Sequence, residues 1–138
     1  RSDLSLDSCR IIDLPRIPDN RGSLTFVEGR RQVPFDMRRI YYLYDVPGDS
    51  ERGAHAHRNL HQVIIAMSGS FDVILDDGRQ KREWHLDRPF YGLYICPLIW
   101  RVLKKFSPGA VCLILASDLY DENDYFRDYD EYLLSVPR

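Results

Sequence analysis

Short stretches in which apolar and polar residues alternate make up most of this 138-residue chain. They are rich in β-branched and aromatic side chains, which favour extended strands, and turn-forming residues separate them. Nine such stretches stand out, at 9–14, 22–28, 38–46, 61–67, 70–77, 82–86, 90–96, 100–106 and 110–117. Nine or ten short strands at this spacing predict one all-β domain over residues 1–138, a sandwich or barrel with a jelly-roll or Greek-key layout.

The connections and the tail add two further elements. The Asp77–Gly78 pair suits the positive φ angles of a tight turn, so the segment 70–86 is predicted to form a hairpin. Beyond residue 118 the pattern changes, because aromatic and apolar residues recur at roughly helical spacing, namely Tyr125, Tyr129, Tyr132 and Leu133. That spacing predicts a short helix near the C-terminus.

Composition narrows the class of protein. The net charge is −2 and basic and acidic residues are interspersed, so no basic face suggests nucleic acid as a partner. No signal peptide is visible and no apolar run is long enough to cross a bilayer, which predicts a cytoplasmic protein without a membrane partner. The three cysteines lack metal-binding spacing and fit free thiols in a reducing compartment. The chain begins with Arg1, as a piece of a longer polypeptide would.

Three of the four histidines, His55, His57 and His61, fall within the stretch ERGAHAHRNLHQ at 51–62. Residues an even number apart point to the same face of a strand, so in a continuous strand all three imidazoles share one face. That face continues through Val63, Ile65 and Met67. We therefore expect the histidines to look into an apolar barrel interior, where they would serve either a metal site or acid–base chemistry.

A divalent metal is the first interpretation of the histidine group. Three ring nitrogens in a β-barrel are a sensible ligand set, and the small residue Gly53 leaves room around them. However, such barrels usually add a carboxylate, and His61 stands where a glutamate would be expected. A later strand that would supply a further ligand presents the cation Arg101 instead.

Acid–base catalysis by His55 and His57 is the interpretation that we favour. Two imidazoles close together on one face can remove a proton from one atom of a substrate and return it to a neighbouring atom. Burial and a nearby cation would both lower their pKa and keep them neutral. Histidines satisfied by local hydrogen bonds are the structural alternative, and this is the role expected of His85.

Arginine and tyrosine side chains would complete such a site. Arg21 opens a predicted strand, and Arg52 immediately precedes the Gly-Ala-His-Ala-His motif. Arginine forks suit phosphate oxygens. Tyr41 and Tyr42 lie on opposite faces of their strand, so one of them looks inward, and alternation alone does not choose between them.

Five stretches together carry a resemblance to a known family: RGSLTFVE, RRIYYLYDVPG, RGAHAHRNLHQVIIAMSGSFDVILDDG, FYGLYICPLIWRVLKKFS and LILASDLYDENDYFRDYDEYL. From about residue 10 to 133 the chain resembles the sugar 3,4-ketoisomerases of the WxcM-like cupin family, which act on dTDP-4-keto-6-deoxyglucose. The resemblance implies a double-stranded β-helix, a homodimer, and no metal or other cofactor. It also implies that the keto group moves from C4 to C3, in the synthesis of deoxyamino sugars for bacterial surface glycans.

Motif by motif, the resemblance implies these site residues: His55, His57, Tyr41, Tyr42, Arg21 and Arg52. One histidine would take the C3 proton, and the other would shuttle protons between O3 and O4 of an enediolate. One tyrosine would stabilise the negative oxygen of the enediolate, and the arginines would bind the pyrophosphate or the sugar hydroxyls.

Two positions depart from the family pattern. Arg101 stands where some relatives have histidine, and His61 stands where relatives can carry a carboxylate. We expect both to contact the substrate, and either change could alter the face on which C4 is protonated. Some relatives are fused to an acyltransferase domain, which makes such a fusion a further expectation here.

Three other functions fit parts of the pattern. A 3,5-epimerase on the same substrate would exchange hydrogen at C3 and C5 without moving the ketone, and it generally pairs its histidine with a carboxylate. A metal-dependent cupin oxygenase would bind iron or a similar ion. A non-catalytic module would bind the sugar nucleotide without turnover.

Overall fold

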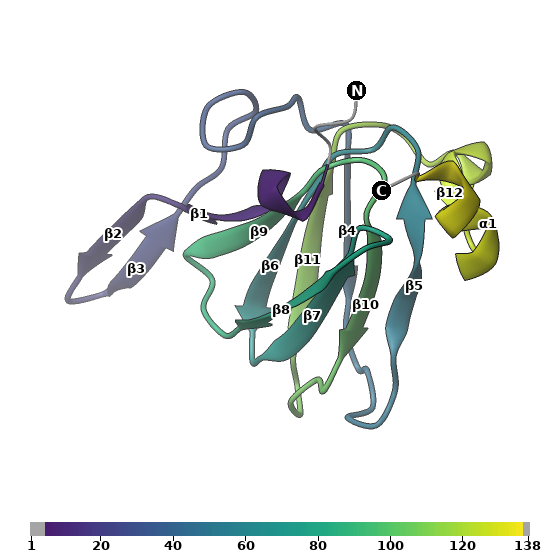
Figure 1. The fold of residues 1–138 in the computed structure, drawn as a ribbon. Coiled ribbons are helices and arrows are strands. Elements are labelled where there is room, and N and C mark those ends of the chain that lie inside the picture. Colours follow the sequence, from purple (N-terminus) through teal and green to yellow (C-terminus); the bar gives the residue numbers. More distant parts are fainter. Residues whose placement is uncertain (1–4, 137–138) are drawn as a thin grey trace.

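The computed structural model describes residues 5–136, which form two facing antiparallel sheets and a two-stranded arm (Figure 1). The first sheet has the spatial order β1 (Arg10–Asp13), β9 (Tyr91–Ile95), β6 (Gln62–Ser68), β11 (Val111–Ala116) and β4 (Arg39–Leu43). The second has the order β12 (Tyr125–Phe126), β5 (Arg52–His57), β10 (Trp100–Lys104), β7 (Phe71–Asp76) and β8 (Lys81–Leu86). Strands distant in sequence are neighbours in both sheets, which confirms the predicted all-β jelly-roll barrel.

Alternation along the strands decides which side chains lie between the sheets. In β4, Tyr41 and Leu43 pack against the core, whereas Ile40 and Tyr42 are exposed on the outer face. Both sheets contribute to the buried core, which includes Val63, Leu93, Val73, Leu75 and Leu103. The β7–β8 hairpin forms around Asp77–Gly78 as predicted.

The C-terminal segment begins with two short elements, η2 (Glu122–Asp124) and β12, before the helix α1 (Tyr129–Ser135). The Asp128 side chain caps α1 by accepting the N–H of Asp130, which places the start of the helix here. The prediction of a C-terminal helix is thus confirmed, but Tyr125 is not part of it, because Tyr125 pairs with His57 of β5. The buried ring of Tyr132 anchors α1 against Trp100, so β12 is held at the end of β5.

A continuous strand from His55 to Met67, which a shared face of the three histidines would require, does not form. β5 ends at His57, and residues 58–61 form a bend before β6 begins. As a result Ile64 lines a cavity inside the barrel, whereas Ile65 and Met67 line a groove that also includes outward-facing Ile40. The expectation of one continuous histidine–aliphatic face is therefore wrong, since the bend resets the alternation.

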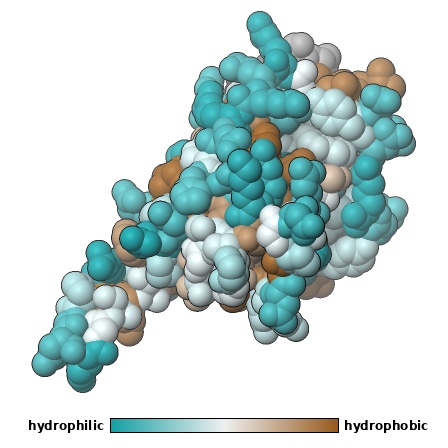
Figure 2. Space-filling view, turned by 90° about the horizontal axis from the view of Figure 1, so that it is seen from below, coloured by the Kyte–Doolittle hydropathy of each residue, from teal (hydrophilic) through white to brown (hydrophobic). Residues whose placement is uncertain are grey.

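The arm consists of β2 (Arg16–Asp19) and β3 (Gly22–Thr25), and the 3-10 turn η1 (Leu6–Ser8) precedes β1. The arm projects clear of the barrel in two perpendicular views (Figures 1 and 2). Its side chains at Ile17 and Leu24 are each 55% exposed. Across residues 5–136, no helix combines the length and the apolar character required to span a bilayer.

Candidate active site

A bulge in β5 brings Arg52 and His55 to the same cavity, although residues three apart in a regular strand face opposite ways. Gly53 and Ala54 both have positive φ angles, 85° and 55°, and the pairing of β5 with β10 slips at this point. A Cβ on Gly53 would lie 3.1 Å from the carbonyl oxygen of Arg101. The left-handed conformation of Ala54 costs on the order of 1 kcal/mol. The bulge is thus a strained feature that re-aims side chains at this place.

His55 and His57 follow the bulge on one face, as their spacing predicts. Their ring centroids are 4.8 Å apart and the rings are nearly perpendicular, at 87°. The ring of Tyr125 covers both, with its centroid 5.0 Å from that of His55 and 4.3 Å from that of His57. The Nε2 atoms of both histidines are buried without a hydrogen-bond partner among the described residues. Buried polar atoms normally have partners, so these two nitrogens hold hydrogen-bonding capacity that the described part of the chain does not use.

A cavity of about 230 Å³ lies inside the barrel, and the His55 ring forms part of its wall. Its apolar wall comes from side chains such as Leu43, Ile64 and Leu103. The side chains with polar groups in the wall are Tyr41, Arg52, His55, Gln62, Arg101, Tyr125 and Arg127. Polar and charged side chains thus converge on a cavity that also has an apolar part, and convergent polar groups of this kind fix the orientation of a small-molecule ligand.

Arg101 brings an unpaired positive charge to this cavity. Its side chain is 2% exposed, and it donates to the side-chain oxygen of Gln62 and, over 3.1 Å, to the carbonyl of Ile99. Its Nε is buried without a partner, and no carboxylate within residues 5–136 forms an ion pair with it. A buried cation without a counter-ion is energetically costly. The site is therefore arranged to receive negative charge.

The same environment keeps both imidazoles neutral. Burial lowers the pKa of His55 to about 3, with Arg101 adding to the effect and a hydrogen bond to the Gly53 backbone opposing it. Burial and Arg101 also lower the pKa of His57. Neutral imidazoles can accept a proton, which is what the acid–base interpretation requires.

Gln62 links Arg101 to Tyr41. Its amide nitrogen donates to the Tyr41 hydroxyl over 2.8 Å, while its oxygen accepts from Arg101. Burial raises the pKa of Tyr41, so its hydroxyl keeps its proton and has it available to donate. Tyr41 is therefore the inward tyrosine, whereas Tyr42 is 58% exposed on the outer face of β4.

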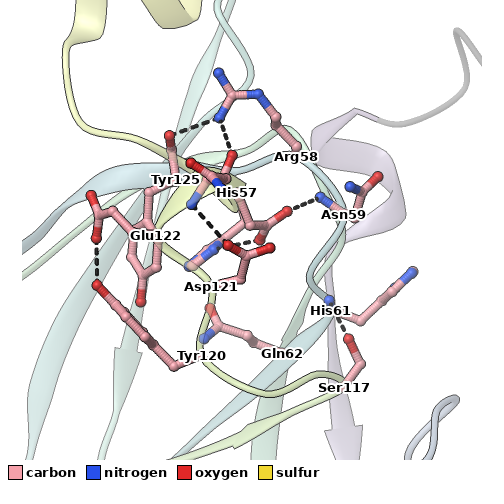
Figure 3. A network of polar contacts seen from close by, with 12 residues as sticks. His57, Arg58, Asn59, His61, Gln62, Ser117, Tyr120, Asp121, Glu122 and Tyr125 are labelled. Carbon is pink, nitrogen blue, oxygen red and sulfur yellow. Dashed lines mark hydrogen bonds and ion pairs between the residues drawn. The ribbon is translucent and has the colours of Figure 1, made fainter.

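Asp124 lies next to His57 on the side away from the open nitrogen. Its Oδ2 is 3.0 Å from Nδ1 of His57, and its Oδ1 accepts the backbone N–H of Asn59 at 2.7 Å. Burial raises the pKa of Asp124, and the Asn59 hydrogen bond acts in the opposite direction. Figure 3 shows His57, Asn59 and Tyr125 in this polar network, and at its edge the hydroxyl of Tyr120 donates a hydrogen bond to Glu122.

A second cavity, of about 370 Å³, adjoins this pair and is here called the outer cavity. Its walls include Arg39, His57, Asp124 and Tyr125. His55 thus lines the inner cavity and His57 the outer one, and Tyr125 belongs to the walls of both. The two imidazoles form a row that leads from one cavity to the other.

The remaining predicted residues lie elsewhere. Nδ1 of His61 is 2.7 Å from the hydroxyl of Tyr94, and His61 lines neither cavity. Because His61 points toward Tyr94, it does not join His55 and His57 in the three-histidine metal site that was considered above. No group of three or more metal-ligating side chains occurs in the described part of the chain. Arg21 lies on the arm with its side chain 86% exposed and its guanidinium 2.8 Å from Asp19. His85 contacts Asp72 on the barrel surface, in keeping with its predicted structural role.

The sequence reasoning missed four residues at this site: Gln62, Asp124, Tyr125 and Arg127. Gln62 directly follows His61 and carries no sequence signal beyond its place in a predicted strand. The other three lie in the acidic, aromatic tail, where the density of Asp and Tyr was the available signal.

Comparisons with known proteins identify a family and several similar enzymes. The family model FdtA, described as WxcM-like, C-terminal, matches residues 7–136. A relative from Aneurinibacillus thermoaerophilus, TDP-4-oxo-6-deoxy-alpha-D-glucose-3,4-oxoisomerase, is 45% identical over 123 residues, which are 89% of this chain and 88% of the relative.

Solved structures give the same result. The TDP-quinovose 3,4-ketoisomerase WlaRB from Campylobacter jejuni is 52% identical with a TM-score of 0.88, over 91% of this chain and 97% of that one. The sugar 3,4-ketoisomerase QdtA from Thermoanaerobacterium thermosaccharolyticum, in complex with TDP, is 42% identical with a TM-score of 0.93, over 96% of each chain. The chain therefore belongs to the FdtA family of WxcM-like, C-terminal proteins.

Proposed function

We propose that this chain is a sugar-nucleotide isomerase that moves the keto group of dTDP-4-keto-6-deoxyglucose from C4 to C3. One observation carries the proposal: two buried, neutral imidazoles lie together next to the uncompensated cation Arg101, and their Nε2 atoms have no hydrogen-bond partner among residues 5–136. The relatives named 3,4-ketoisomerases supply the substrate and the direction of the reaction.

His55 is the proposed base, because it lines the inner cavity together with the arginines. The C4 ketone acidifies the hydrogen on C3, and neutral His55 takes that proton to leave an enediolate across C3 and C4. The positive charge of Arg101 and the proton of the Tyr41 hydroxyl stabilise the developing oxyanion. These groups are fixed in advance by Gln62, so they need little rearrangement when charge develops.

His57 is the proposed proton shuttle between the two oxygens. His57 accepts the proton of the C3 hydroxyl and delivers it to O4. His55, which took the proton from C3, delivers a proton to C4. At the end the ketone is at C3, and both imidazoles are neutral again. Arg52 and Arg127, at the cavity wall, are the proposed partners of the pyrophosphate.

A 3,5-epimerase is the second candidate, and the His57–Asp124 contact is the observation in its favour. A histidine paired with a carboxylate is what that class is expected to use. The ketoisomerase has the stronger support, because moving the ketone requires a proton shuttle between O3 and O4, and a second imidazole lies with its ring centroid 4.8 Å from that of the first.

NMR of dTDP-4-keto-6-deoxyglucose in D2O with the purified protein tests the proposal. Migration of the ketone signal from C4 to C3 is the expected result, with His55→Asn as the inactive control. Deuterium at C3 and C5 with the ketone still at C4 would establish the epimerase. Binding without any change in the sugar would show a binding module.

We also propose a homodimer that places the arm of each copy on its partner. The outer face of the first sheet exposes Ile40 and Met67, at 57% and 48%. With the arm, this face borders an apolar groove of about 420 Å³. Exposed apolar surface of this kind marks protein interfaces. Ile40→Glu together with Met67→Glu is expected to give a monomer by light scattering, whereas a monomeric parent chain would contradict the proposal.

Arg21 keeps its proposed role in substrate binding only in such a dimer, because it lies outside the cavity of its own chain. Mixed dimers of an Arg21→Ala chain and a His55→Asn chain test this. Random pairing would restore one intact site in half of the dimers, or about one quarter of the wild-type rate. No recovery on mixing would place Arg21 outside the site.

A further inference from the structure

Asp124 is held by three contacts, two of its carboxylate and one of its backbone. Its Oδ2 lies 3.0 Å from Nδ1 of His57, its Oδ1 accepts the Asn59 N–H at 2.7 Å, and its backbone carbonyl accepts the N–H of Arg58 at 2.8 Å. Both carboxylate oxygens are thus in use, and neither can rotate away without losing a hydrogen bond. The side chain is 13% exposed and His57 is fully buried, so water does not readily replace these contacts.

These contacts decide which nitrogen of His57 carries the proton. A neutral imidazole has one N–H and one lone pair. A carboxylate accepts hydrogen bonds but cannot donate them, so the N–H must be on Nδ1, facing Asp124. The lone pair is then on Nε2, which is buried and has no partner in the described part of the chain.

We propose that Asp124 is a positioning residue that fixes His57 as the Nδ1–H tautomer, so that Nε2 presents a lone pair to the substrate. The inference rests on the proposed function for its catalytic meaning, since the shuttle must first accept the O3 proton. When it does, Asp124 faces the new imidazolium and stabilises its charge. Nε2 then returns the same proton to O4, so no proton is gained or lost by the pair.

The Asn59 N–H makes the proposal sharply testable. In Asp124→Asn, the amide oxygen must accept from that N–H, because the amide NH2 cannot. The NH2 group therefore faces His57, whose Nδ1 has to become the acceptor. The isosteric substitution thus reverses the tautomer, and Nε2 becomes a donor that cannot take the O3 proton.

The direct test is ¹⁵N–¹H NMR of histidine-labelled protein, with the His57 ring assigned by loss of its signals in His57→Asn. The expected result is a proton on Nδ1 of His57 in the wild-type chain and on Nε2 in Asp124→Asn. A wild-type His57 protonated on Nε2 would overturn the proposal without reference to any variant, so it stays testable even if Asp124→Asn folds poorly.

Kinetics supply the second readout, with Asp72→Asn as a matched control. Asp72 contacts Nδ1 of His85 at 2.6 Å, away from both cavities. We expect Asp124→Asn to lower kcat on the order of 10²- to 10⁴-fold with little change in KM, and Asp72→Asn to leave both within about twofold. Equal, small effects of the two substitutions would contradict a positioning role. If the wild-type chain lacks ketoisomerase activity, the proposed function fails, while the tautomer measurement still decides the role of Asp124.

Discussion

Two histidine–aspartate pairs in this barrel have the same chemistry and different surroundings. His57 and Asp124 approach to 3.0 Å, and His85 and Asp72 approach to 2.6 Å, in both cases through Nδ1. The side chain of His57 is fully buried, whereas that of His85 is 60% exposed. The shorter contact thus belongs to the pair on the surface.

The comparison shows that burial, and the groups nearby, give such a pair its function. Water can reach the ring of His85 and satisfy its second nitrogen. His57 has no such access, and Tyr125, His55 and the charge of Arg101 surround it. Its Nε2 therefore has no partner in the described part of the chain, at the energetic cost of an unsatisfied polar atom.

The largest expected difference between the pairs is in activity. His57→Asn is expected to lower kcat on the order of 10³-fold, because the O3 proton then has no acceptor. His85→Asn is expected to leave kcat within about twofold. Steady-state assays of the two variants at equal protein concentration measure this, and a comparable loss in both would mean that the surroundings do not distinguish the pairs.

A smaller change is expected from the cation beside the buried pair. Arg101 lowers the pKa of His55, so in Arg101→Met that pKa rises toward its ordinary value. The base is then protonated at higher pH, and the acid limb of the pH dependence of kcat/KM moves upward. We expect the loss of oxyanion stabilisation to lower kcat on the order of 10²-fold as well. An acid limb that stays in place or moves downward would show that Arg101 does not act on His55.

A further difference between the buried and the exposed histidine concerns stability in acid. The pKa of His55 is about 3 in the folded chain and near 6.5 when unfolded. Between these values only the unfolded state binds the proton, so stability falls as pH drops, by up to about 1.4 kcal/mol per pH unit. His55→Asn should lose less stability across this window than the wild type or His85→Asn. Urea unfolding at several pH values measures it, and parallel curves for all three would contradict a buried, neutral His55.

Much of this arrangement follows from the sequence by local rules. Strand positions, the Asp77–Gly78 hairpin and the shared face of His55 and His57 all come from alternation and turn chemistry. Arg101, which we expected to contact the substrate, lies in the wall of the inner cavity. The alternation of residues therefore predicts the face of each side chain correctly where a strand is regular.

The rest depends on contacts that local rules do not contain. The bulge needs a positive φ at Ala54, which its residue type does not signal, and the bend before β6 turns His61 toward Tyr94. Asp124 is separated from His57 by 67 positions, and the pairing of the adjacent strand β12 with β5 brings them together. Long-range pairing of this kind is invisible to a single-sequence pattern.

The most direct test of the whole account is the fate of the C3 hydrogen in D2O, followed by NMR in His55→Asn and His57→Asn. The account predicts that His55→Asn leaves the C3 hydrogen in place. In His57→Asn, His55 is still present as the base, so the C3 hydrogen should exchange for deuterium while the ketone stays at C4. Exchange in His55→Asn together with its absence in His57→Asn would reverse the two roles and contradict the account.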